Sequence, residues 1–373
     1  MILKIQNKIN AKTRKKMSRS VLVDLSALRD LYCGLGQVAL SYGRYFEKNY
    51  RKADATYSLT LLVPDDMIGK FGNEVSYLSS SRRLTRKFQF LFPKFDVWHS
   101  IHQSTRFKPR YPKTKYILTI HDLNYLYETK GLNRLTKHLK LQQKISKADE
   151  IVCISKFTKA EVEEHTRLKG KKCRVIYNHI EPLNKSQFIE PTIEIKKPFF
   201  FSLGVIQMKK NFHVLLDLMK LYPDRHLYIA GKESKKAQKN GYAEMIKSRI
   251  LNENITNVTL LGGITHEEKI WFYENCEAFL FPSLFEGFGI PVVEAMQFGK
   301  AVFCSQETSL KEIGSEYAFF WDNFDAKNMK LLIDRNLDVF YNDKERVLKE
   351  IEYAMSFTSD SHFKQYEKLY ETV

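Results

Sequence analysis

The sequence contains no apolar run that approaches the ~18 residues a helix needs to cross a bilayer. It also lacks the features of a secretory signal peptide, because its N-terminus is rich in lysine and asparagine and has no continuous apolar segment. Hydrophobic residues make up 43% of the chain, as in soluble globular proteins. We therefore expect a soluble protein, and its 373 residues are enough for two domains with separate cores.

Cysteine is scarce. The five cysteines are odd in number and widely scattered, and they form no C-x-x-C pair or metal-like cluster: Cys33, Cys153, Cys173, Cys276 and Cys304. Several of them fall inside apolar segments that are typical of core strands. This pattern predicts reduced thiols in a cytoplasmic protein.

Negative charge is in the minority. The chain has 60 Lys and Arg against 43 Asp and Glu, and all of the excess positive charge lies within residues 1–190. A field of this sign attracts nucleic acid, an anionic membrane or a phosphate-bearing substrate. No nucleic-acid partner is expected, because no zinc motif, RNP string or helix-turn-helix accompanies the charge; a basic nucleic-acid-binding protein remains the remote alternative.

Short apolar segments alternate with helical patterns along the chain. Continuous Val, Ile, Leu and Phe runs between helices are typical of parallel strands buried on both faces. Two such series predict an α/β protein with two Rossmann-like, doubly wound domains. The predicted strands are Val21–Leu25, Ser58–Val63, Val97–Ile101, Tyr116–Ile120, Ile151–Ile154, Arg174–Tyr177, Phe199–Leu203, His226–Ala230, Val258–Leu261, Ala278–Phe281, Ala301–Cys304 and Ala318–Trp321.

The same pattern gives the expected domain boundaries. They are a flexible basic tail over 1–16, an N-terminal domain over 17–185, a polar, proline-bounded linker over 186–198, a C-terminal domain over 199–355 and a final helix over 356–373. Met17 stands directly before the first strand, so it is an alternative start of the protein. Mass spectrometry of the native N-terminus distinguishes the two starts.

The segment from Phe281 to Met296 carries the strongest signal for function. An apolar strand stops at Pro282, a loop with two glycines follows, and Pro291 opens a helix, where proline is favoured. The first turn of a helix presents free N–H groups and partial positive charge, which suit a phosphate. Glu286 and Glu294 stand on either side of the turn. The segment therefore predicts an anion site flanked by two carboxylates, as a nucleotide sugar requires.

The whole string Pro-Ser-x-x-Glu-Gly-Phe-Gly-x-Pro-x-x-Glu-Ala-Met resembles the E-x7-E signature of retaining glycosyltransferases of family 4, which have the GT-B fold. The resemblance implies two Rossmann-like domains that face each other across a cleft, with a last helix that crosses back to the N-terminal domain. It implies that Glu286 contacts the donor sugar and Glu294 the ribose. It also implies that the amides of Phe288, Gly289 and Ile290 bind the diphosphate.

A second anion element runs from Phe201 to Asn211. A strand ends at Gly204, and two lysines, Lys209 and Lys210, precede a helix. The segment is similar to the family's G-x-x-x-x-(R/K)-K-N phosphate loop, which implies that Lys210 binds the donor phosphates. Many members have arginine directly after the glycine, and this chain has Val205 there. Lys209 is the candidate to supply that second charge, and two solvated lysines at a helix start are the alternative.

Further residues stand on weaker signals. His121, with Asp122, follows an apolar strand at the edge where open α/β sheets bind ligands, and the family resemblance implies that His121 contacts the transferred sugar. Asp122 is expected to be structural. Gly34 and Gly36 resemble the family's acceptor-side loop, with an ordinary tight turn as the alternative. Ser155 is expected to be an N-cap.

The segment over residues 82–95 mixes four early cations with four phenylalanines. Such a stretch can lie in a membrane interface, with its aromatic residues in the acyl boundary and its cations on anionic headgroups. An amphipathic core helix with a basic face is the equal alternative. We therefore expect a cytoplasmic protein, and peripheral attachment to the inner face of the membrane through the N-terminal half stays open.

The resemblance implies retaining transfer of a hexose from a nucleotide diphosphate sugar, with GDP-mannose as the first choice and UDP-hexoses still open. The implied acceptor is a glycan or a lipid-diphosphate-linked sugar of a bacterial surface polysaccharide. No cofactor and no metal are expected, since Lys210 and helix amides supply the positive charge. The residues expected to take part in catalysis are Glu286, His121 and Lys210. The alternatives are another GT-B enzyme, such as a sugar-nucleotide epimerase or a phosphorylase.

Overall fold

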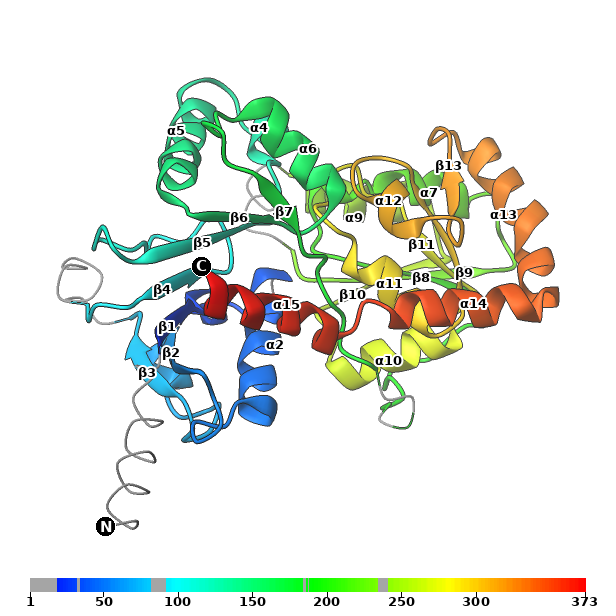
Figure 1. Ribbon diagram of the computed structural model, residues 1–373. Coiled ribbons are helices and arrows are strands. Elements are labelled where there is room, and N and C mark those ends of the chain that lie inside the picture. The colour runs from blue at the N-terminus through cyan, green and yellow to red at the C-terminus, as the bar shows by residue number, and fades with distance from the viewer. Residues whose placement is uncertain (1–18, 32–33, 82–91, 184–185, 187, 234–240) are drawn as a thin grey trace, which may run out of the picture. The chain divides into compact units, whose positions relative to one another are not determined.

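The computed structural model describes residues 19–31, 34–81, 92–183, 186, 188–233 and 241–373 (Figure 1). The predicted tail over 1–16, Cys33 and most of the basic aromatic segment over 82–95 lie outside the described residues. Residues 92–95 of that segment are described, among them Phe92 and Phe95. Both are buried, and Phe92 stacks on Trp98 with ring centroids 5.8 Å apart. These two aromatic residues therefore belong to the protein core.

The first sheet has seven parallel strands in the order β3-β2-β1-β4-β5-β6-β7. They are β1 (Arg19–Asp24), β2 (Tyr57–Val63), β3 (Ser76–Ser79), β4 (Val97–Ser100), β5 (Lys115–Ile120), β6 (Glu150–Cys153) and β7 (Cys173–Val175). The associated helices are α2 (Gly34–Asn49), α4 (Tyr125–Glu128), α5 (Gly131–Lys147) and α6 (Lys156–His165). Six of these strands were predicted, and β3 was missed.

The second sheet has six strands in the order β10-β9-β8-β11-β12-β13. They are β8 (Phe199–Leu203), β9 (His226–Ala230), β10 (Val258–Gly262), β11 (Ala278–Phe281), β12 (Ala301–Ser305) and β13 (Phe319–Trp321), all predicted. The helices are α7 (His213–Met219), α9 (Tyr242–Asn252), α10 (His266–Asn275), α11 (Ile290–Gln297), α12 (Leu310–Gly314), α13 (Ala326–Asn342), α14 (Lys344–Met355) and α15 (Ser359–Thr372).

The second sheet is covered on both faces, which explains its uninterrupted apolar strands. Phe199 and Phe201 of β8 pack into one core with residues of α10 and α11, and Phe200 packs into the other with residues of α7, α9 and α13. Successive side chains of a strand point to opposite faces, so each residue of β8 has a core to enter. The prediction of doubly wound parallel sheets is confirmed.

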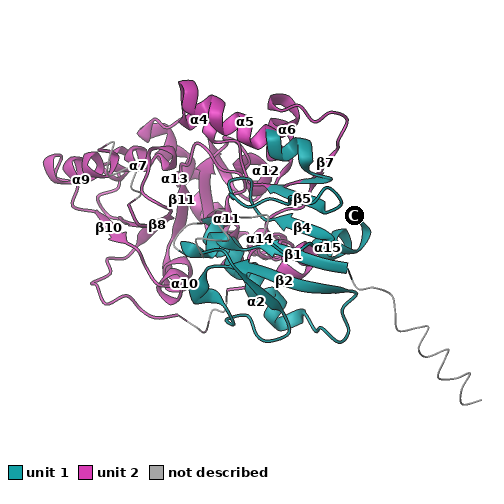
Figure 2. Cartoon of the chain, turned by 90° about the vertical axis from the view of Figure 1, so that its left-hand side faces the viewer, with its two compact units in different colours: residues 1–119, 143–151, 364–373 teal, residues 120–142, 152–363 magenta. Residues whose placement is uncertain are grey.

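The chain divides into two compact units (Figure 2). Unit 1 holds the chain up to Thr119 with Gln143–Ile151 and Lys364–Val373, and unit 2 holds Ile120–Gln142 and Val152–Phe363. This division does not follow the two sheets strand by strand, and the domain boundaries given above stay predictions. Within the described residues, no helix combines the length and the apolar character that a membrane span requires.

The end of helix α15 returns to unit 1, as the resemblance implied. Tyr370 donates or accepts a hydrogen bond of 2.8 Å with Nδ1 of His99 on β4, and Tyr366 makes one of 2.9 Å with Thr119 on β5. The main-chain oxygen of Val373 accepts a hydrogen bond from Arg19 on β1. The last residues of the chain are therefore part of the core of unit 1.

Candidate functional site

The loop between β11 and α11 holds Glu286 in a mostly buried ion pair. Its Oε1 lies 2.5 Å from Nζ of Lys210 and accepts a hydrogen bond of 2.6 Å from the Ser283 hydroxyl. The main chain of Glu286 is fixed too, since its N–H donates to Thr308 and its carbonyl accepts from Ser309. The carboxylate therefore has a defined position at the carboxyl end of the sheet.

Lys210 reaches this carboxylate from the loop after β8. Residues Met208–Lys210 form a 3₁₀ turn that ends at Asn211 in the left-handed region, with φ of 57°. Gly204 has φ of 157°, and a Cβ there would lie 3.0 Å from Cε of Lys210. Gly204 thus leaves room for the lysine side chain. The main-chain N–H of Leu284 donates a hydrogen bond to the carbonyl of Lys209. This bond joins the loop after β11 to the loop after β8.

Burial and charge together set the ionisation of this pair. Burial alone would raise the pKa of Glu286, but Lys210 and Lys209 and the hydrogen bonds from Lys210 and Ser283 outweigh it, so the pKa is lowered. Burial lowers the pKa of Lys210, and Glu286 only partly opposes this. The carboxylate is therefore held ionised, and the ammonium group beside it is poorly solvated and suited to an anionic ligand.

Lys209 points to a different carboxylate. Its Nζ lies 3.6 Å from Oε1 of Glu128, the last residue of the short helix α4. Asp122 belongs to the same charged group: burial raises its pKa, and Lys209 opposes that rise. One oxygen of Asp122 accepts a hydrogen bond from the N–H of Asn124, which confirms its predicted structural role. Glu128 had no signal in the sequence analysis.

His121 is buried at the end of β5, and its main chain touches the Glu286 loop. A Cβ at Gly287 would lie 1.9 Å from the His121 carbonyl oxygen, so only glycine fits at that position. Ser155 donates to the Gly287 carbonyl at 2.8 Å, and Thr158 donates to the His121 carbonyl at 3.1 Å. Ser155 is also the N-cap of α6, as predicted.

Helix α11 begins as the anion-site prediction requires. Gly289 is its N-cap with φ of 104°, proline follows in the first turn, and no side chain caps the described N-terminus. Phe288 is buried, and its ring packs against Phe357 with centroids 5.4 Å apart. The side chain therefore anchors the loop, while the amides of Phe288, Gly289 and Ile290 remain the predicted phosphate contacts.

Glu294 lies one turn into α11 and is held by two residues of α10. Its Oε1 lies 2.5 Å from Nζ of Lys269, and its Oε2 accepts a hydrogen bond of 3.0 Å from the Tyr273 hydroxyl. Sequence reasoning missed both partners, because nothing in their local pattern distinguishes them from other residues of an amphipathic helix. A ribose at Glu294 has to share the carboxylate with them or displace Lys269.

Gly34 and Gly36 lie in the first turn of α2 and not in a loop. A Cβ at Gly36 would lie 1.8 Å from the carbonyl oxygen of Asp30, whereas nothing lies within 4 Å of one at Gly34. Gly36 is thus required for close packing of the helix start on the preceding turn. The acceptor-side role of the two glycines stays a prediction.

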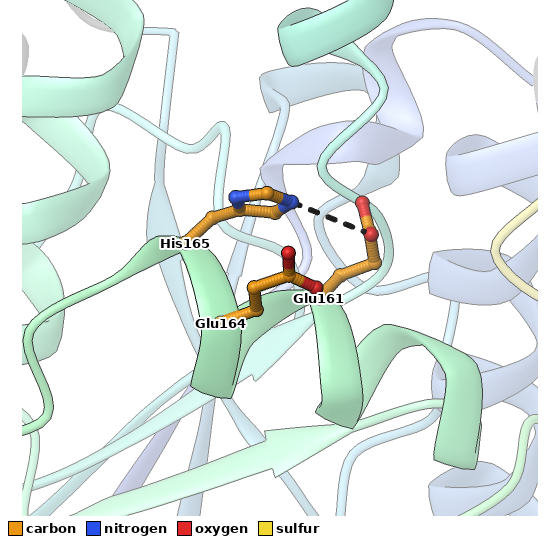
Figure 3. Close-up of side chains that lie close together, drawn as sticks. All are labelled: Glu161, Glu164 and His165. Carbon is orange, nitrogen blue, oxygen red and sulfur yellow. Dashed lines mark ion pairs between the residues drawn. The ribbon is translucent and has the colours of Figure 1, made fainter.

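Three side chains of α6 come close enough to share a metal ion: Glu161, Glu164 and His165 (Figure 3). Nε2 of His165 lies 3.6 Å from one oxygen of Glu161, whose other oxygen accepts a hydrogen bond from Tyr127. Each oxygen of Glu161 thus contacts a side chain of the protein, His165 or Tyr127. The four described cysteines are free thiols, which agrees with the expected reduced state.

Comparison with known families covers most of the chain. A family model described as Glycosyl transferases group 1 matches residues 184–352, and one described as Glycosyltransferase Family 4 matches residues 42–182.

Two curated relatives illustrate the similarity in sequence. The O-antigen chain mannosyltransferase RfbU of Salmonella typhimurium is 24% identical over 58% of this chain and 59% of its own length. A Campylobacter jejuni enzyme is 29% identical over 49% of this chain and 48% of its own length. It is named N-acetylgalactosamine-N,N'-diacetylbacillosaminyl-diphospho-undecaprenol 4-alpha-N-acetylgalactosaminyltransferase. The chain thus spans less than two thirds of the length of either relative.

Solved structures match almost the whole chain. Sucrose-phosphate synthase from Thermosynechococcus elongatus has a TM-score of 0.71 at 16% identity, with 95% of this chain and 98% of that chain covered. The Anabaena protein Alr3699/HepE in complex with UDP-glucose has a TM-score of 0.69 at 13% identity, with 95% and 100% covered. At these identities the likeness establishes the fold alone.

Proposed function

Because the chain belongs to the family 4 glycosyltransferases of the GT-B fold, we propose that it transfers a hexose from a nucleotide diphosphate sugar with retention of configuration. The acceptor in this proposal is a glycan or a lipid-diphosphate-linked saccharide of a bacterial surface polysaccharide. The observation that carries the proposal is the buried Lys210–Glu286 pair, which joins the two loops that follow β8 and β11.

Each partner of the pair has a role in the proposed reaction. The Lys210 ammonium group neutralises the diphosphate as negative charge develops on it, and the amides at the start of α11 add partial positive charge. The ionised Glu286 accepts hydrogen bonds from hydroxyl groups of the donor sugar. Lysine and amides provide the charge stabilisation, so the proposed mechanism is metal-independent and uses no cofactor beyond the nucleotide sugar.

His121 contacts the transferred sugar in this proposal, and its place is fixed by the contact between its carbonyl and Gly287. A front-face transfer, in which the leaving phosphate helps to deprotonate the acceptor, needs no protein nucleophile. Glu294 accepts hydrogen bonds from the ribose. The neighbouring Lys269 keeps this carboxylate in a positive environment before the donor binds.

GDP-mannose is the proposed donor and a lipid-diphosphate-linked sugar the proposed acceptor. The first choice is supported by a mannosyltransferase among the relatives, and the second by one whose name specifies a diphospho-undecaprenol substrate. We propose a cytoplasmic enzyme that attaches peripherally to the inner face of the membrane, which such an acceptor requires.

A donor screen tests the function. Wild-type protein is incubated with GDP-mannose, UDP-glucose and UDP-N-acetylgalactosamine, with and without a saccharide-diphospholipid acceptor, and nucleoside diphosphate release is measured. We expect acceptor-dependent release with one donor and an anomerically retained product. Turnover that yields only an isomerised nucleotide sugar, or that needs inorganic phosphate, would indicate an epimerase or a phosphorylase instead.

Variants of the buried pair test the site. We expect Lys210→Ala and Glu286→Ala each to lower kcat roughly 100-fold or more. Removal of one partner of a buried ion pair also costs about 3–5 kcal/mol of stability. The double variant Lys210→Met with Glu286→Leu therefore separates folding from catalysis: it should fold and remain inactive. Lys349→Ala breaks an exposed Lys–Glu pair on α14 and is the control. Wild-type rates in both single variants would refute the site.

A further inference from the structure

Helix α5 has a row of leucines on its solvent-exposed surface. Leu132, Leu135 and Leu139 are 81%, 52% and 58% exposed, and they follow the i, i+3, i+7 spacing that puts side chains on one helical face. Leu141 and Ile145, on the opposite face, are buried. Single exposed leucines are common on protein surfaces, but an aligned row is typical of a surface that another apolar phase covers.

The charge of α5 identifies the kind of partner. The helix has no Asp or Glu and four exposed cations, Arg134, Lys137, Lys140 and Lys147, besides the buried Lys144. The other helices with several exposed apolar residues, α13 and α14, both contain acidic residues. An apolar row on a helix whose charged residues are all cations matches the interface of an anionic bilayer, where leucines enter the acyl boundary and long lysine side chains reach the headgroups.

Helix α5 is packed against the protein near its C-terminus and is exposed at its N-terminus. Residues 131–137 are all exposed, whereas Nζ of Lys144 is buried and donates to the Gln103 carbonyl at 2.7 Å. His138 makes a hydrogen bond of 2.9 Å with Tyr125 of α4, the helix that ends at Glu128. The exposed turns are therefore fixed in place and linked to the element that contacts the phosphate-loop lysine.

We propose that the first turns of α5 are a lipid-docking surface that inserts Leu132, Leu135 and Leu139 into the headgroup region of an anionic membrane. This rests on the proposed peripheral attachment and assigns it to a defined helix. A second copy of the chain is a poorer occupant, because two such helices would bring like charges together.

Vesicle co-sedimentation of the full-length protein tests the proposal. One set of vesicles is phosphatidylcholine, and the other contains about one third phosphatidylglycerol. The test variant carries Leu132→Gln, Leu135→Gln and Leu139→Gln and keeps every charge. The control variant carries Leu331→Gln, Val339→Gln and Leu348→Gln, which change three exposed apolar residues on α13 and α14.

We expect the wild type and the control to bind anionic vesicles and the α5 variant to bind them at least tenfold more weakly, since each leucine buried in the interface contributes about that factor when fully inserted. Arg134→Gln with Lys137→Gln and Lys140→Gln should weaken binding roughly fivefold per charge. Equal binding of the α5 variant and the wild type would overturn the proposal, as would equal binding to neutral and anionic vesicles.

Two further measurements identify other outcomes. If the α5 variant changes the sedimentation velocity of the protein without changing vesicle binding, the face is a contact between copies and the proposal fails. Donor turnover with a water-soluble acceptor should be the same in the wild type and the α5 variant. If the wild type itself shows no donor turnover, the proposed function is contradicted, but the vesicle-binding result still stands.

Discussion

Two carboxylates of unit 2, one mostly buried and one fully buried, lie in opposite electrostatic environments. Glu286 has Lys210 at 2.5 Å and a hydrogen bond from Ser283, and its pKa lies below the usual value. Glu350 on α14 is fully buried, and neither of its oxygens has a hydrogen-bond partner among the described residues. Burial raises the pKa of Glu350 to about 9, although Arg346 partly opposes the shift. One carboxylate is thus kept charged and the other neutral.

The neutral state of Glu350 makes the free energy of unfolding depend on pH. Because the folded pKa is above the unfolded value of 4.5, the contribution of Glu350 is most favourable below that value and is lost as pH rises toward about 9. At pH 7 the raised pKa of Glu350 therefore lowers the free energy of unfolding by about 3 kcal/mol. We therefore expect Glu350→Gln to gain stability relative to the wild type as pH increases from 5 to 8, measured by urea unfolding.

Two comparisons sharpen this prediction. Glu352→Gln, which changes an exposed glutamate on the same helix, is the matched control. Glu350→Leu removes both the charge and the unpaired polar atoms, and it should show the same slope as Glu350→Gln. A stability difference between wild type and Glu350→Gln that is constant over this pH range would contradict the assignment of a raised pKa.

At the scale of elements, the short helix α4 brings a competing anion to the phosphate loop. Its last residue, Glu128, lies 3.6 Å from Nζ of Lys209, the candidate for the second positive charge of that loop. Tyr127 of the same helix stacks on Phe285 of the Glu286 loop, with ring centroids 5.1 Å apart. Helix α4 therefore contacts both loops of the candidate site.

Removal of the competing charge should favour the donor. We expect Glu128→Gln to lower KM for the nucleotide sugar about two- to fivefold with a smaller change in kcat, since partly exposed ion pairs are worth about 0.2–1 kcal/mol. Steady-state kinetics with varied donor concentration measure this. Glu163→Gln on α6, which breaks an exposed pair with Lys159, should leave KM unchanged. A raised KM in Glu128→Gln would mean that Glu128 itself binds substrate.

The elements also show what the sequence could and could not predict. Strands such as β8 were predictable because they are buried on both faces and read as unbroken apolar runs. Strand β3, Ser76–Ser79, was missed because it is a short edge strand with serine at both ends that pairs only with β2.

The sequence likewise predicted some residues of the site and missed others. Lys210 and Glu286 stand in recognisable motifs after strands, and the structure brings them together. Glu128, Lys269 and Tyr273 contact site residues from helices whose local sequence gives no sign of that contact. Only the folded arrangement of distant segments identifies them, because ion-pair partners far apart in sequence leave no local periodicity.

At the scale of the whole molecule, the last residues of the chain complete the core of its first part. Tyr366 and Tyr370 of α15 are buried, and with His99 and Thr119 they form a continuous chain of hydrogen bonds. The Tyr366 ring also stacks on His99, with centroids 4.6 Å apart. The first strands synthesised therefore depend on the last helix for a full set of buried contacts.

This dependence predicts a local loss of stability from a substitution at the far end of the sequence. We expect Tyr370→Ala to cost about 3–5 kcal/mol, as for other large aromatic truncations in cores. Tyr370→Phe keeps the ring but leaves the His99 ring nitrogen without its 2.8 Å partner, and it should cost about 1–3 kcal/mol. Hydrogen exchange should accelerate in β1 and β4 and stay unchanged in β8 and β9. Equal acceleration in both sheets, or none in β1, would show that α15 does not stabilise unit 1 specifically.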